Sequence, residues 1–143
     1  MPYRYLDDIA TADAAFEAWG TSPEELFISS ADAVLNVMVE NLDSIIDKER
    51  RTIRCETDSL DMLLISLLEE LVYYKDAERL FLRIEHVDIR NDGTRWSLNA
   101  RAYGEEINPE KHELVVDVKA VTFYRFRLEQ SGGKWKATVV LDI

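Results

Sequence analysis

The stretch LVVDVKAVTFYRFRLE, residues 114–129, alternates between two sets of side chains along its length. Mostly apolar residues recur at every second position from Leu114 to Leu128, while the other set is mainly charged. A period of two predicts a long β-strand with one buried face. Ser131-Gly132-Gly133 follows, and its two glycines favour a tight turn into a second strand at residues 134–142. This part of the chain therefore predicts a β-hairpin.

Two other regions show the same alternation. Residues 80–90 and 95–103 flank Asn91-Asp92-Gly93-Thr94, which predicts a second hairpin. Residues 13–20 also alternate, and Gly20 marks the end of that strand. We therefore expect β-structure at both ends of the chain.

Two segments have helical periodicity instead. Ser22 and Glu25 form a capping box, and Pro23 suits the first helical turn, so one helix begins here and ends near Asn41. A second helix is expected to begin at Thr57-Asp58. Its apolar stripe is Leu60, Leu63, Leu64, Leu67, Leu68, Leu71 and Val72. Because two helices can cover only one face of a sheet, we expect one α+β domain over residues 1–143. It would have a single antiparallel or mixed sheet with both helices on one face.

The composition limits the classes of function that this protein can have. The 143 residues are 47% hydrophobic, which is enough for one core, and their net charge of −11 repels phosphate. We expect no direct binding to nucleic acid, and a basic protein surface is the more compatible partner. The N-terminus lacks the layout of a signal peptide, no apolar run is long enough to span a membrane, and Cys55 is the single cysteine. A soluble, cytoplasmic protein with no membrane contact is expected.

The C-terminal strand carries a possible cation site. It places the side-chain carboxylate of Asp142 near the terminal carboxylate of Ile143. Two negative charges this close repel each other unless water, a basic group or a hard cation screens them, and Ca²⁺ and Mg²⁺ prefer such oxygens. The alternative is that both groups simply face water.

Several short stretches of sequence indicate a particular protein family more specifically than the periodicity does. They are Ala10-Thr11-Ala12-Asp13, Gly20-Thr21-Ser22-Pro23-Glu24-Glu25-Leu26-Phe27, Glu69-Glu70-Leu71, Gly104-Glu105, Asn108-Pro109-Glu110-Lys111-His112-Glu113, Val118-Lys119-Ala120-Val121-Thr122-Phe123-Tyr124 and Leu141-Asp142-Ile143. In these strings, over almost its whole length, the chain resembles the archease family. These are small proteins that assist the RtcB type of tRNA-splicing RNA ligase.

The resemblance implies a site and a role. Asp13, Asp142 and the terminal carboxylate of Ile143 would hold a divalent metal ion, with calcium preferred and magnesium or manganese as alternatives. Asp13 and Asp142 both lie at predicted strand ends, where their side chains can converge. The protein would not be an enzyme. It would be a cytoplasmic activator in tRNA processing that promotes guanylylation and multiple turnover of the ligase.

The chain departs from the family pattern at two positions. The family usually reads His-Thr-Ala-Asp and Thr-Tyr-His, whereas this chain has Ala10 and Tyr124 where those histidines would stand. Without imidazoles, the implied site has only oxygen ligands, which suit Ca²⁺, Mg²⁺ or Mn²⁺ rather than zinc.

Lys119 and His112 are candidates for partner contact. The alternative for Lys119 is a surface pair with Asp117, and the alternative for His112 is an ordinary solvated loop residue. No catalytic residue is assigned. The competing function is a metal-independent chaperone or interaction module for RNA-processing enzymes.

Overall fold

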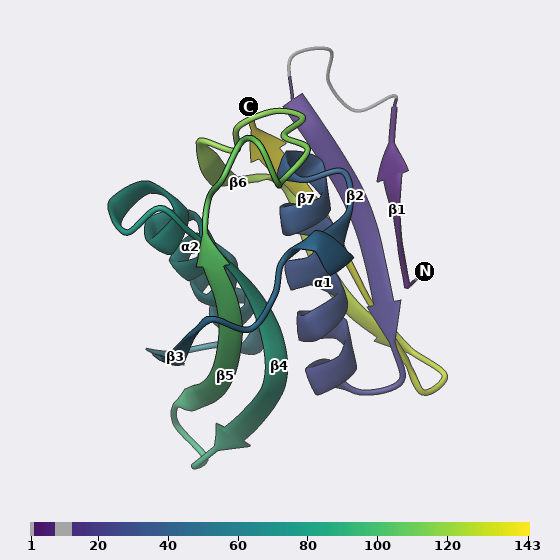
Figure 1. The fold of residues 1–143 in the computed structure, drawn as a ribbon. Coiled ribbons are helices and arrows are strands. Elements are labelled where there is room, and N and C mark those ends of the chain that lie inside the picture. Colours follow the sequence, from purple (N-terminus) through teal and green to yellow (C-terminus); the bar gives the residue numbers. More distant parts are fainter. Residues whose placement is uncertain (1, 8–12) are drawn as a thin grey trace.

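The computed structural model describes residues 2–7 and 13–143 (Figure 1). In chain order its elements are β1 (Tyr3–Leu6), β2 (Asp13–Gly20), α1 (Pro23–Met38), the 3₁₀ turn η1 (Leu42–Ser44), β3 (Glu49–Thr57), α2 (Leu60–Ala77), β4 (Leu80–Asn91), β5 (Trp96–Glu106), β6 (Ala120–Ser131) and β7 (Lys134–Asp142). The α+β class and both predicted hairpins are confirmed. None of the described helices is long and apolar enough to cross a membrane.

The strands form two antiparallel sheets, so the predicted single sheet is wrong. One sheet has the order β1-β2-β7-β6 and the other has the order β3-β5-β4. Residues 107–119 connect β5 of one sheet to β6 of the other and form no strand. Within that connection Leu114 makes one isolated bridge to Val39.

Helix α1 lies between the two sheets (Figure 1). It contacts β2 and β7 on one side and β4 on the other, while α2 packs on the three-stranded sheet and on β6. Because α1 is covered on two sides, its buried side chains are not confined to one narrow face of the helix. They are Leu26, Phe27, Ser29, Ser30, Ala31, Ala33, Val34, Leu35, Val37 and Met38. Burial of a Val, Leu, Phe or Met side chain contributes about 1.5–3 kcal/mol, so this helix is central to the core.

A serine N-cap sets the first residue of each α-helix. Ser22 Oγ accepts a hydrogen bond from the Glu25 N–H at 3.1 Å, and the Glu25 carboxylate accepts from the Thr21 N–H at 3.2 Å. Helix α2 begins slightly later than predicted because Ser59 is its cap, with Oγ accepting from the Met62 N–H at 3.2 Å. In both helices a serine side chain satisfies an N–H group that the first turn would otherwise leave unpaired.

Strand β6 differs from its prediction in length and in register. It begins at Ala120, and its pairing with β7 shifts between Thr122 and Arg127. Four residues therefore oppose the single residue Val139, and within this bulge Arg125 has a φ of 53°. A bulge changes which face each later side chain occupies. The alternation predicted for residues 114–129 is wrong on both sides of this point: Val121, before the bulge, is buried, and Tyr124, inside it, is exposed.

Candidate functional site

The predicted acidic residues meet at one edge of the four-stranded sheet. Asp13 is the first residue of β2 and lies directly opposite Asp142, the last residue of β7. On its other side, Asp142 lies opposite Ala120, the first residue of β6. Directly opposed residues of antiparallel strands point to the same face, with Cβ atoms about 5 Å apart. Two carboxylates from opposite ends of the chain therefore share one small surface.

No basic side chain neutralises this pair within residues 2–7 and 13–143, because none forms an ion pair with Asp13 or Asp142. Glu17 is on the same face of β2, since strand side chains alternate, and provides a contrast. Its carboxylate lies 3.1 Å from an Arg4 nitrogen and 3.7 Å from Lys136 Nζ. Directly opposed like charges are destabilising, so a cation would relieve a repulsion at Asp13 and Asp142 that Glu17 does not experience.

The chemistry of this edge fits a hard divalent cation. Asp13 is half-buried and Asp142 is exposed, and both offer carboxylate oxygens, which Ca²⁺, Mg²⁺ and Mn²⁺ favour. In the described part of the chain, no group of three or more His, Cys, Asp or Glu side chains could hold a metal ion. Further ligands would have to be the Ile143 carboxylate, backbone carbonyls, water or a partner's groups. The metal site stays a prediction.

Lys119 lies next to the acidic pair. Its backbone N–H donates to the Asp142 carbonyl oxygen at 2.7 Å, and its side chain is exposed. The alternative of a surface pair with Asp117 is wrong, because the Asp117 carboxylate pairs with Lys75 Nζ at 2.7 Å. Lys119 also lines a groove of about 400 Å³ beside Tyr73 of α2. Its backbone thus lies beside the acidic edge, and its side chain is exposed to a partner.

Of the two positions at which the chain departs from the family pattern, the structure describes only Tyr124. Ala10 is outside the described residues. Tyr124 is in the β6 bulge, where 53% of its surface is exposed and the Arg125 guanidinium lies 5.5 Å from its ring centroid. Tyr124 carries no imidazole, so it is not a replacement for the family's histidine as a nitrogen ligand.

Comparison with known proteins identifies the family. Residues 3–143 match the model of the Archease protein family (MTH1598/TM1083). The chain belongs to the archease family. Protein archease from Pyrococcus abyssi is 39% identical over 134 residues, covering 93% of this chain and 94% of the relative. Protein archease from Methanosarcina mazei is 35% identical over 142 residues, covering 99% and 95%.

Solved structures agree with this membership. The solution structure of protein 1598 from Methanobacterium thermoautotrophicum matches with a TM-score of 0.85 and 34% identity, covering 99% of both chains. A Thermotoga maritima crystal structure, described as "an archease, possible chaperone", matches with a TM-score of 0.60 and 18% identity, covering 94% of this chain and 93% of the other. The second match shows the fold alone.

In this member of the archease family, His112 is buried, so the expectation of a solvated loop histidine is wrong. Its Nε2 lies 3.1 Å from Glu105 Oε2, and its Nδ1 accepts from the Asn108 N–H at 2.9 Å. The ring also packs edge-on against Phe81 at a centroid distance of 5.5 Å. A partner does not reach this imidazole from outside, and His112 instead ties residues 108–112 to β5.

Glu105 is the residue that the sequence interpretation missed. Its carboxylate is buried and accepts hydrogen bonds from Lys111 Nζ at 2.7 Å and the Ile46 N–H at 2.9 Å, besides its contact with His112. Burial would raise the pKa of Glu105, but these hydrogen bonds outweigh it and lower the pKa from 4.5 to about 2. The signal was available, because strings containing Glu105, Lys111 and His112 all belong to the archease pattern.

We expect Glu105 to make the protein sensitive to acid. Because its pKa is depressed in the folded state, its contribution is present above the ordinary value of 4.5 and is lost as the pH falls toward about 2. That contribution is about 3 kcal/mol. Urea unfolding at pH 7 and pH 3 should show a smaller loss of stability for Glu105→Gln than for the wild type. Parallel losses in the two proteins would contradict the assignment.

Proposed function

We propose that this protein is an accessory activator of an RtcB-type RNA ligase, and that it promotes guanylylation and multiple turnover of that enzyme. Membership of the archease family supports the proposal, because the family resemblance implies this role. The protein itself would catalyse no reaction. Its contribution would come from a cation-binding edge that meets the ligase.

The observation that carries the proposal is the placement of Asp13 directly opposite Asp142, with no basic ion-pair partner among the described residues. These two carboxylates and the carboxylate of Ile143 would hold the ion, with calcium preferred and magnesium or manganese as alternatives. Three ligands do not fill the shell of such an ion, so oxygen atoms of the ligase or its nucleotide can complete it. When bound, the ion would supply positive charge to balance phosphate oxygens.

Lys119 would act beside the ion. Its backbone bond to Asp142 fixes its Cα next to the acidic edge, and its exposed ammonium group can donate to a phosphate or a carboxylate of the partner. The acidic pair and Lys119 together would make the contact surface specific, because each requires a group of opposite charge on the ligase.

The test is RNA ligase turnover with and without this protein, in the presence of GTP and a series of Mn²⁺, Mg²⁺ and Ca²⁺ concentrations. Many ligation events per ligase molecule are expected only when the protein and a divalent ion are both present. If the number of ligation events is the same without the protein for every ion, the proposal fails.

A second candidate is a metal-independent chaperone or interaction module. Exposed apolar side chains support it: Leu114, Val115 and Val116 before β6, and Phe123 and Tyr124 in the bulge, are each between 41% and 61% exposed. Leu114, Val115 and Val116 are consecutive in the chain, and exposed apolar patches mark contact surfaces. Protection of an aggregating client protein that persists in EDTA would favour this function, whereas protection that EDTA abolishes would argue for the ion.

A further inference from the structure

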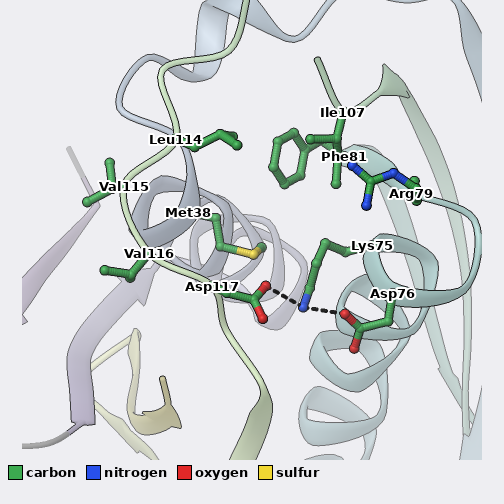
Figure 2. Close-up of a pocket in the computed structure, with 10 residues that line it drawn as sticks. All are labelled: Met38, Lys75, Asp76, Arg79, Phe81, Ile107, Leu114, Val115, Val116 and Asp117. Carbon is green, nitrogen blue, oxygen red and sulfur yellow. Dashed lines mark hydrogen bonds and ion pairs between the residues drawn. The ribbon is translucent and has the colours of Figure 1, made fainter. Parts of the chain in front are cut away.

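Lys75, in the last turn of α2, is a buried charged residue with a defined set of partners (Figure 2). Only 6% of its surface is exposed. Its Nζ donates to Asp76 Oδ1 at 2.5 Å, to Asp117 Oδ1 at 2.7 Å and to the Val118 carbonyl oxygen at 2.7 Å. The three N–H donors of the ammonium group are therefore all used.

Stability alone does not explain this lysine. Its pocket, of about 420 Å³, is also lined by apolar side chains, among them Met38, Phe81 and Ile107 (Figure 2). Burial in such surroundings lowers the pKa of Lys75, but the hydrogen bonds that its ammonium group donates to Asp117 and Asp76 outweigh burial and raise the pKa above its usual 10.5. The group is thus charged at neutral pH. The carboxylates of Asp76 and Asp117 are largely exposed, and ion pairs to exposed carboxylates contribute little to stability. The segment that the charge holds in place therefore indicates its role.

Hydrogen bonds connect Lys75 to the acidic edge through residues 117–119. Residues 116–119 belong to no strand, so no ladder of hydrogen bonds fixes their backbone. Lys75 binds this segment at Asp117 and at Val118, and the next residue, Lys119, donates its N–H to the Asp142 carbonyl oxygen at 2.7 Å. Helix α2 is connected in this way, through two hydrogen-bonded steps, to the strand end that carries Asp142.

We propose that Lys75 is a positioning residue for the acidic site: it fixes residues 117–119 and, through the Lys119 N–H, the backbone of Asp142. The inference rests on the proposed function, because it assigns Lys75 a part in building that same site. It gives Lys75 no contact with the ion. Its effect would be that of an outer partner which orients a metal ligand.

The test uses Lys75→Met, which keeps the length of the side chain and removes its charge and donors. Titration of the protein alone with Ca²⁺ and Mn²⁺ should show half-saturation at an ion concentration about tenfold higher than for the wild type. Hydrogen exchange of the Lys119 amide should be faster. The control is Lys136→Met, which removes an ion pair with Glu17 on the same sheet and should change neither measurement.

Lys75→Arg separates positioning from simple filling of the pocket. Arginine keeps the charge and the N–H donors, so the Lys75→Arg protein should bind the ion more tightly than the Lys75→Met protein. If Lys75 only fills space, the Lys75→Met protein should instead bind the ion more tightly than the Lys75→Arg protein. If Lys75→Met does not fold, Lys75→Gln replaces it, because glutamine keeps a donor for Val118 without the charge.

The outcomes also separate this inference from the proposed function. If the wild type binds the ion and stimulates the ligase, and the Lys75 variants bind the ion equally well, the inference is overturned while the function stands. If the wild type binds no ion, the proposed site fails. The exchange rate of the Lys119 amide then still decides whether Lys75 holds this segment, and an unchanged rate would refute that as well.

Discussion

Asp13→Asn and Asp142→Asn are each expected to weaken divalent-ion binding by at least about tenfold and to reduce ligase stimulation to the level seen without the protein. Each substitution removes one of two directly opposed carboxylates while preserving the shape of the side chain. It also removes a repulsion between like charges, so the folded state should be as stable as the wild type or slightly more stable. Ion titration, ligase turnover and thermal unfolding measure the three effects.

Glu17→Gln is the matched control for these two variants. Glu17 lies on the same face of β2, but its charge is already balanced by Arg4 and Lys136. We expect this variant to retain ion binding and ligase stimulation. Full stimulation by both aspartate variants would remove the acidic site from the mechanism, and loss of stimulation in all three variants would mean that overall charge, rather than this site, is responsible.

Gly104→Ala is expected to destabilise the protein by about 3 kcal/mol or more. A Cβ atom at this position would lie 1.7 Å from the Phe81 carbonyl oxygen and 2.8 Å from its carbonyl carbon. Gly104 is also held on both sides, because it pairs with Glu49 of β3 and with Leu82 of β4. The clash is therefore with backbone that cannot move without breaking a ladder. Urea unfolding followed by circular dichroism gives the change in free energy of unfolding.

The control is Asn99→Ala, an exposed position on the same strand, which should change stability by no more than about 0.5 kcal/mol. If Gly104→Ala loses less than about 1 kcal/mol, β4 and β5 are further apart at this point than the structure places them. The prediction also bears on the archease pattern, since Gly104 precedes the buried Glu105 and brings β4 close enough for Phe81 to pack against His112.

Local patterns in the sequence were sufficient to predict most of the elements. Ser22, Pro23 and Glu25 place the start of α1 correctly, because capping depends on residues a few positions apart. Gly93, Gly132 and Gly133 all have positive φ values, which is why the turns of both hairpins could be recognised. The opposition of Asp13 and Asp142 was expected from the family resemblance, and the register of β2 and β7 provides its geometry.

Features that depend on distant parts of the chain were not predictable. Residues 114–119 continue the alternation of β6 but lack a partner strand, and a periodic pattern cannot show whether a partner exists. The burial of His112 depends on Glu105 and Phe81, which come from two different strands. The contacts of Lys75 likewise cross from α2 to the connection before β6, so nothing in the sequence near Lys75 indicates them.

The position of α1 between the two sheets has a consequence for how the molecule unfolds. Neither sheet can separate from this helix without exposing apolar side chains that the other sheet also covers. The two sheets should therefore melt together as one cooperative unit rather than as separate subdomains. Calorimetry should give equal calorimetric and van't Hoff enthalpies, and the slowest-exchanging amides should be found in α1.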